Sequence, residues 1–195
     1  ISASAVGYYV GESAPVRDDS SAPGDNFLAK VCQAWEEAAT PARDSGIRVF
    51  HPRIGVVLSP RGGALAKMLP VFKAGLGGVA GNGQQGFSWI DLDDLLGAFG
   101  HAMVKGDMKG AYNVCSPQPV TNRELAGTLG RVLHRPAVVP VPAVAIRLLF
   151  GQMGQECLLE GPRVVPSGLT RSGFTFYESS LEGALKWQLG LFRTT

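Results

Sequence analysis

The feature that most constrains this sequence is a near-continuous apolar run over residues 47–58. A strand that alternates polar and apolar residues keeps one face in water, whereas a strand that is apolar throughout is covered on both faces. Coverage of both faces is typical of parallel sheets flanked by helices. The run therefore predicts an α/β protein, and His51-Pro52 is a point at which the strand could divide.

Helical and strand-like segments alternate along the rest of the chain. Asp25 or Asn26 can cap a helix that ends at Thr40-Pro41, and Thr121 with Glu124 forms a capping box. The expected helices are residues 27–39, 65–72 with a kink at Pro70, 91–103, 121–133 and 179–190, and one opened by Pro142; the expected strands are 1–6, 47–58, 87–90, 112–115, 138–141 and 173–176. This alternation predicts an α/β architecture, and the length of 195 residues fits one domain or a domain plus a small lobe.

Phe27, Val31 and Trp35 recur at four-residue spacing in the first expected helix. Residues four apart lie on one face of a helix. We expect this stripe to face the core.

A glycine-rich segment over residues 75–86 contains a formal GxGxxA match at residues 75–80. That motif binds pyrophosphate when a strand leads into it and a helix follows, because the free N–H groups of the helix then meet the phosphate. Here a helical pattern precedes the glycines, and the sequence Gly81-Asn82-Gly83 that follows them favours a turn and not the start of a helix. We therefore expect a mobile loop and no phosphate site.

Composition excludes several classes of function. The net charge is +2 and the basic residues do not cluster, which disfavours nucleic-acid and membrane binding. Three cysteines and three histidines are scattered without metal-ligand spacing, so we expect no metal site, no disulfide framework, and a cytoplasmic or other reducing compartment.

An ordered set of short motifs resembles a known family. The set is Ser4-Ala5-Val6-Gly7-Tyr8-Tyr9, Trp35-Glu36, Arg53-Ile54-Gly55-Val56-Val57-Leu58, Gly62-Gly63-Ala64-Leu65, Gly75-Leu76-Gly77-Gly78, Trp89-Ile90-Asp91-Leu92-Asp93-Asp94 and Tyr112-Asn113-Val114. In this order the motifs resemble the YfcH-like epimerase proteins, a branch of the extended short-chain dehydrogenases/reductases. The stretch after Pro142 resembles the small module that closes that family.

The resemblance implies the C-terminal part of a Rossmann-type, doubly wound parallel sheet with a small α/β substrate lobe, and NADP(H) as cofactor. It assigns residues 1–60 and 88–115 to the NADP-binding domain and residues 61–87 and 116–190 to the substrate lobe and C-terminal module. It also implies a fragment, because the family's glycine fingerprint is absent from this chain.

The catalytic pair of the family is missing. Extended members place tyrosine and lysine four residues apart on one helix for proton exchange, and no YxxxK occurs here. With Glu36 set on the family's helix glutamate, Leu28 falls in the tyrosine position and Cys32 in the lysine position. The resemblance implies a cofactor-binding set made of Leu28, which would touch the nicotinamide, and Cys32, Arg53, Ile54, Gly55 and Val56.

The remaining site candidates each have a structural alternative. Ser4 matches the family serine and Tyr8 could replace the proton donor; alternatively, the Ser4 hydroxyl bonds backbone. Strand alternation would send Tyr8 and Tyr9 to opposite faces. The predicted substrate-binding residues are Tyr9, Gln84 and Trp89. For Trp89 the alternative is core packing, for Arg53 an ion pair, and for Asp91, Asp93 and Asp94 helix capping in place of metal binding.

Three functions follow as hypotheses. The first is an NADP(H)-dependent oxidoreductase or epimerase-like protein acting on an unidentified small molecule. The second is a catalytically silent NADP(H)-binding sensor or scaffold. The third is an interaction module without a cofactor. The sequence is also compatible with a homodimer.

Overall fold

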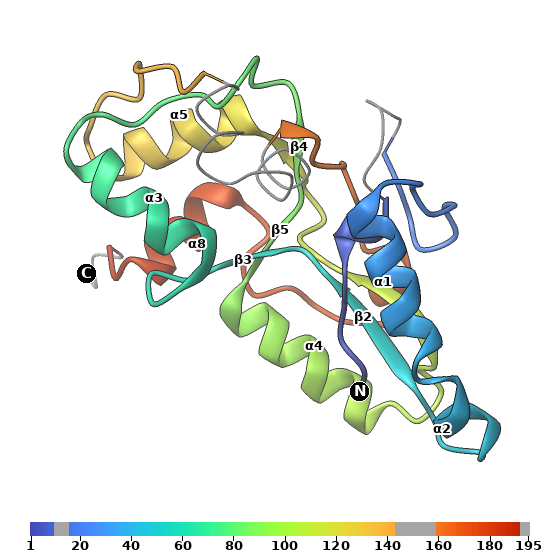
Figure 1. Cartoon of the computed structure of the whole chain (residues 1–195). Coiled ribbons are helices and arrows are strands. Elements are labelled where there is room, and N and C mark those ends of the chain that lie inside the picture. The colour runs from blue at the N-terminus through green and yellow to red at the C-terminus, as the bar shows by residue number, and fades with distance from the viewer. Residues whose placement is uncertain (10–15, 143–158, 192–195) are drawn as a thin grey trace.

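A computed structural model describes residues 1–9, 16–142 and 159–191 (Figure 1). Its main sheet has the order β1-β2-β6, formed by β1 (Ser4–Ala5), β2 (Phe50–Ile54) and β6 (Gly110–Val114). Both pairings are parallel, with Ser4 opposite Arg53 and Ile54 opposite Val114. The predicted α/β fold with a parallel sheet is confirmed.

The apolar run divides at Gly55 and not at His51-Pro52, which lies inside β2. Past Gly55 the chain leaves the main sheet as β3 (Val56–Leu58), which pairs in parallel with β5 (Trp89–Asp91). Gly55 N–H donates to Val114 O, and Val56 N–H donates to Ser88 O at 2.7 Å. A Cβ on Gly55 would lie 2.9 Å from Ser88 O, so glycine permits the crossover.

The helices follow the predicted capping signals. Asn26 caps α1, Asp91 caps α4, Ser180 caps α8, and Thr121 with Glu124 forms the capping box of α5. The helical elements are η1 (Val6–Tyr9), α1 (Phe27–Glu37), α2 (Thr40–Asp44), α3 (Gly63–Lys73), α4 (Leu92–Val104), α5 (Asn122–Val132), α7 (Ser167–Arg171) and α8 (Leu181–Gln188). Side-chain caps therefore account for the starts of α1, α4, α5 and α8, whereas α2, α3 and α7 begin without a side-chain cap.

Several expected elements differ. Thr40-Pro41 opens the short α2 because proline is accepted in a first helical turn. The expected strand at 87–90 is split between β4 (Gly86–Phe87), which pairs antiparallel with β7 (Val120–Thr121), and β5. Residues 138–141 supply a single bridge, Ala80 to Val141, and residues 173–176 form no strand. The helix expected after Pro142 lies outside the described residues.

Two apolar clusters lie on either side of the short pair β3–β5. Trp89 packs with Leu58, Leu129 and residues of α3 and α8, whereas its neighbour Ile90 packs with Phe50 and residues of α4. Successive side chains of a strand point to opposite faces, so β5 serves both clusters. Within the apolar run 47–58, Leu58 is buried in the first cluster and Phe50 in the second, as predicted, whereas Ile47 lies before β2 and is 60% exposed.

The apolar stripe on α1 was predicted wrongly. Phe27 and Trp35 are 58% and 52% exposed, while Ala29 and Cys32 are buried. Glu36 lies on the inward side, where it binds two polar groups of the sheet. These polar contacts fix the rotation of α1, and the larger apolar residues remain outside.

The segment 75–86 is tied to the rest of the chain. Val139 N–H donates to Gly77 O and Gly81 N–H donates to Val141 O. A Cβ on Gly78 would overlap Val139 O, so its glycine serves a close backbone approach. The segment is a loop, as expected, and no helix directly follows the GxGxxA match in the sequence.

Among the described residues, no helix has the length and apolar character needed to cross a membrane. Within the same residues, histidine, cysteine and acidic side chains form no group of three that could hold a metal ion.

Candidate functional site

Most of the predicted site residues gather at the carboxyl ends of β1 and β2, beneath α1. Ligands of open parallel sheets bind beyond this edge. The helical turn η1 follows β1 directly, and α1 packs against both β1 and η1 (Figure 1). Residues from three distant parts of the sequence therefore meet here.

A buried ion pair forms the centre of this cluster. Arg53 donates from Nε to Glu36 Oε1 and from Nη2 to Glu36 Oε2, both at 2.8 Å. Ser4 Oγ donates to the same Glu36 Oε1, also at 2.8 Å. Arg53 is only 5% exposed and Ser4 is also buried. The Ser4 hydroxyl thus bonds a carboxylate, and the ion-pair alternative for Arg53 is the one realised.

Two tyrosines extend the cluster. The Arg53 guanidinium carbon lies 3.5 Å from the centroid of the Tyr8 ring, a cation–π contact. Arg53 Nη1 donates to Tyr9 Oη at 2.6 Å, and Tyr9 Oη donates to Asn113 Oδ1 at 2.9 Å. Tyr9 is 2% exposed, so its predicted contact with substrate is replaced by this structural role. Tyr8 keeps part of its surface in solvent.

The prediction that Tyr8 and Tyr9 face opposite ways was wrong. Their rings meet edge to face with centroids 5.0 Å apart. Strand alternation does not apply because the chain turns into η1 after Ala5, and both rings pack around Arg53.

Electrostatics favours the charged form of the pair. Burial alone would raise the pKa of the Glu36 carboxyl, but hydrogen bonds from Arg53 and Ser4 hold that pKa below its usual range. Burial alone would lower the pKa of Arg53, and the bonds to Glu36 raise it above its usual value. Burial raises the pKa of Tyr9 to about 12. Glu36 is therefore an ionised acceptor and Tyr9 a protonated donor at neutral pH.

Leu28 and Cys32 lie beside the end of β1. A Cβ on Gly7 would lie 3.6 Å from both Cys32 Sγ and Leu28 Cβ. Burial raises the pKa of the Cys32 thiol, which weakens it as a nucleophile. The two side chains that the resemblance sets in the tyrosine and lysine positions are thus an apolar group and a protonated thiol beside the end of β1.

The other three cofactor candidates lie where β2 ends and β3 begins. Ile54 closes β2, and Gly55 and Val56 form the crossover to β3. Arg53 makes four hydrogen bonds within the protein, to Glu36, Tyr9 and the Asp19 backbone, so its side chain is not available to bind a phosphate of a cofactor.

Two predicted substrate residues lie outside this cluster. Trp89 is fully buried in the core and donates its indole N–H to Gln118 O at 3.0 Å, which matches the core-packing alternative. Gln84 is exposed in the loop after Gly83. Asp91 accepts from Asp93 N–H, and Asp94 accepts from the backbone of residues 177 and 178, so capping and loop anchoring explain the acidic residues.

Two residues of the cluster were not predicted from the sequence. Asn113 fixes Tyr9 from β6. Asp19 accepts from Asn113 N–H at 2.6 Å and from Gly168 N–H at 2.7 Å, which joins the loop after η1 to β6 and α7. Asp19 stands in a polar loop whose composition gives no sign of these distant partners. Glu36 matches a helix glutamate in the resemblance to the family, but no sequence pattern indicates its ion pair with Arg53.

The groups described at this edge combine one apolar side chain with the backbone of two glycines, as many small-molecule sites do. Gly7 and Gly55 place backbone atoms at the carboxyl ends of β1 and β2. Leu28 of α1 adds an apolar side chain beside Gly7. Apolar walls with a few fixed backbone groups are typical of such sites. The buried cation of the cluster, Arg53, is already paired with Glu36, so its charge is not free for an anionic ligand.

Comparison with known proteins agrees with this geometry. The family model described as a domain of unknown function (DUF1731) matches residues 141–188. Epimerase family protein Mb2239 of Mycobacterium bovis is 44% identical over 95% of this chain, and the human epimerase family protein SDR39U1 is 38% identical over 93% of it. The chain spans 62% of the length of both relatives.

Solved structures show the same fold. A crystal structure of human SDR39U1 with NADPH has a TM-score of 0.89 and 34% identity, covering 97% of this chain and 64% of that one. A nucleoside-diphosphate sugar epimerase from Corynebacterium glutamicum has a TM-score of 0.76 and 34% identity, covering 97% of this chain and 37% of that one. The comparisons support the epimerase family for this chain, with the DUF1731 domain at its C-terminal side and the parallel-sheet α/β fold of Rossmann-like epimerase structures.

Proposed function

We propose that this protein binds NADP(H) at the carboxyl ends of β1 and β2 and uses it in oxidoreductase or epimerase-like chemistry on a small carbonyl or sugar-like molecule. The observation that carries the proposal is the meeting of Gly7, Leu28 and Cys32 at this edge beside the Ser4–Glu36–Arg53 cluster. The human relative of similar structure was crystallised with NADPH. The YfcH-like branch remains our proposal within the family.

The cofactor would supply hydride, and the chain would have to manage the proton. Leu28 cannot exchange one, and Cys32 and Tyr9 are held protonated by burial. Tyr8 is the partly exposed tyrosine of the cluster, and its ring is held by Arg53 at 3.5 Å. We assign the proton exchange with substrate to the Tyr8 hydroxyl, with Arg53 as the group that fixes the ring.

The test is hydride transfer by the protein, measured as NADPH oxidation over a panel of carbonyl substrates. Tyr8→Phe should lower turnover by about a hundredfold, the usual size of a general acid contribution, without weakening NADPH binding. Tyr177→Phe, at a 65% exposed tyrosine outside the cluster, is the matched control and should leave turnover unchanged. Equal turnover by wild type and Tyr8→Phe would remove Tyr8 from the mechanism.

The second candidate is a catalytically silent NADP(H)-binding sensor or scaffold. The observation that favours it is that Ser4, in the position of the family serine, is buried and donates its hydroxyl hydrogen to Glu36. Such a serine does not position a substrate oxygen. Quenching of protein fluorescence by NADPH, together with no turnover on the panel, would select this function. Absence of NADPH binding would reject both candidates in favour of an interaction module.

Two further expectations remain proposals. We propose a small-molecule partner and a homodimer in solution, for which the exposed Phe27 and Trp35 offer apolar surface on α1. We also keep the division into residues 1–60 with 88–115 and residues 61–87 with 116–190. The pairing of residues 77–81 with residues 139–141 supports the second unit.

A further inference from the structure

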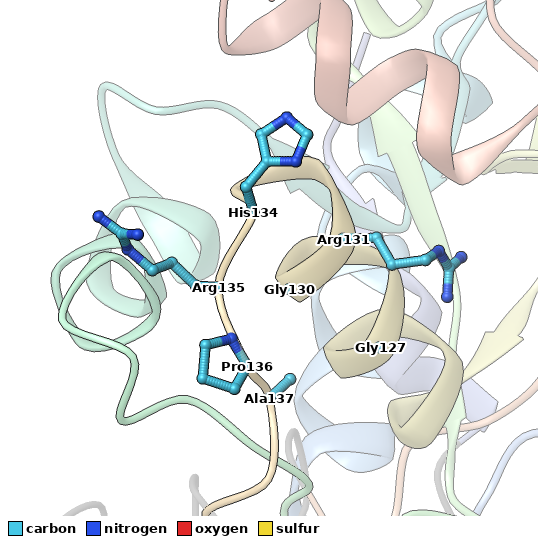
Figure 2. A pocket seen from close by; sticks show the side chains of 7 residues that line it. All are labelled: Gly127, Gly130, Arg131, His134, Arg135, Pro136 and Ala137. Carbon is cyan, nitrogen blue, oxygen red and sulfur yellow. The ribbon is translucent and has the colours of Figure 1, made fainter.

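A second concave surface lies along the C-terminal half of α5, away from the proposed NADP(H) edge. It is a shallow depression, open to solvent, with a volume of about 610 Å³. Three small residues, Gly127, Gly130 and Ala137, form its floor, and three basic residues, Arg131, His134 and Arg135, stand around it (Figure 2). We call this surface the α5 groove.

The floor depends on a close approach between α5 and the chain that follows it. A Cβ on Gly130 would lie 2.8 Å from Ala137 Cβ and 2.9 Å from Arg135 O. Gly127 is open on its outer side, where the nearest atom to such a Cβ is Arg131 Nη1 at 3.7 Å. The glycines therefore let the returning chain form one wall and leave an apolar floor beside it.

His134 holds an unusual backbone conformation at the end of this groove. Its φ is 52°, and it is the one non-glycine residue with positive φ in the described parts of the chain. His134 N–H donates to Arg131 O and Arg135 N–H donates to Gly130 O, which is the Schellman motif that glycine usually completes. Non-glycine residues in this region carry a steric cost and cluster at functional positions.

The ionisable side chains that line the groove are all basic, although Arg131 Nη2 lies 4.0 Å from Glu182 Oε2 in an exposed ion pair that an acidic partner would have to displace. The groove is lined by Arg131, His134 and Arg135 and by no acidic side chain of the described residues. Figure 2 shows the three basic side chains pointing in different directions from the groove, so one small anion cannot reach all of them. A partner with several separated carboxylates can.

Exposed apolar side chains border the same surface. Val138 is 78% exposed and Leu76 is 60% exposed. The segments that carry them lie side by side, since Val139 N–H donates to Gly77 O and a Cβ on Gly75 would touch Pro136. The surface thus combines a small-residue floor, an apolar border and separated cations.

We propose that the α5 groove binds an extended acidic peptide segment of a partner protein, with small side chains on the glycine floor and carboxylates at Arg131 and Arg135. This interaction is independent of the proposed chemistry at β1 and β2. The separated positive charges select a partner whose negative charges have a matching spacing, and the glycine floor admits only narrow side chains.

The test is fluorescence anisotropy with the natural protein and a short labelled peptide of alternating glutamate and alanine. We expect saturable binding that weakens as salt rises. The Arg131→Gln/Arg135→Gln variant should bind about fivefold to tenfold more weakly, the size expected for two exposed charge pairs. Lys30→Gln, at an exposed lysine on α1, is the matched control and should bind as wild type does.

A peptide with glutamine in place of glutamate should not bind. His134→Gly relieves the backbone strain, so it should fold at least as well as wild type and yet bind the acidic peptide more weakly. Equal binding of the glutamine peptide, unchanged affinity in the double arginine variant, or tighter binding of a short single-stranded RNA would each overturn the proposal.

Discussion

Replacing Glu36 with glutamine tests the ion pair at the centre of the candidate site. The carboxylate accepts two hydrogen bonds from Arg53 and one from Ser4, each at 2.8 Å. Glutamine keeps one acceptor oxygen but removes the negative charge. Arg53 is only 5% exposed, so its positive charge would then be buried without a counter-charge. An uncompensated buried charge costs about 3 kcal/mol or more, so Glu36→Gln should lower the free energy of unfolding by about that amount.

The assay is urea unfolding followed by circular dichroism, with Glu37→Gln as the matched control. Glu37 is the next residue of α1 and is exposed, so its substitution should change the free energy of unfolding by less than about 0.5 kcal/mol. Similar stabilities of the two variants would refute the account of Glu36. Reversal by a second substitution, Arg53→Met, would show that the unpaired charge causes the loss.

The same pair predicts a dependence on pH. The folded-state pKa of Glu36 is depressed, so its contribution is fully present above the ordinary glutamate pKa and is lost as pH falls through the folded-state pKa. The difference in unfolding free energy between wild type and Glu36→Gln should therefore be constant near neutral pH and shrink in acid. A difference that grows on acidification would contradict this sign.

Three further predictions concern packing, backbone strain and thiol reactivity. Gly55→Ala should destabilise by about 1–3 kcal/mol, because its Cβ would press on Ser88 O at 2.9 Å, whereas Gly62→Ala, with open space around it, should be nearly neutral in thermal unfolding. His134→Gly should raise the free energy of unfolding by about 0.5–1 kcal/mol in urea titration, since glycine accepts a φ of 52° without strain; a loss of stability would show that the imidazole supports the fold. Burial raises the pKa of the Cys32 and Cys115 thiols, so both should alkylate slowly at pH 8 in the native protein, as peptide mapping would show; rapid alkylation of either would mean that its site opens.

The fold was predictable where the sequence carries local signals. Two-sided burial of the run 47–58 indicated a parallel sheet, and caps such as Asn26 and Thr121 gave the starts of α1 and α5. The division of that run at Gly55 was not predictable, because it follows from the close approach of Ser88 and Cys115 from other parts of the chain. Local patterns do not contain such contacts.

The candidate site was predictable only in part. The placement of Leu28 and Cys32 beside β1 followed from the spacing to Glu36, which a helix fixes. The ion pair of Glu36 with Arg53 rotates α1, and this explains why the apolar stripe of Phe27 and Trp35 was assigned to the wrong face. Buried polar contacts between distant segments override apolar periodicity, and their partners cannot be read from spacing.

The most direct test of the central claim is a crystal structure of the natural protein with NADP(H) bound. The account predicts a nicotinamide ring against Leu28 and the Gly7 backbone, with the Glu36–Arg53 pair unbroken beneath it. A nicotinamide placed away from the end of β1, or an Arg53 side chain turned outward onto a cofactor phosphate, would contradict it.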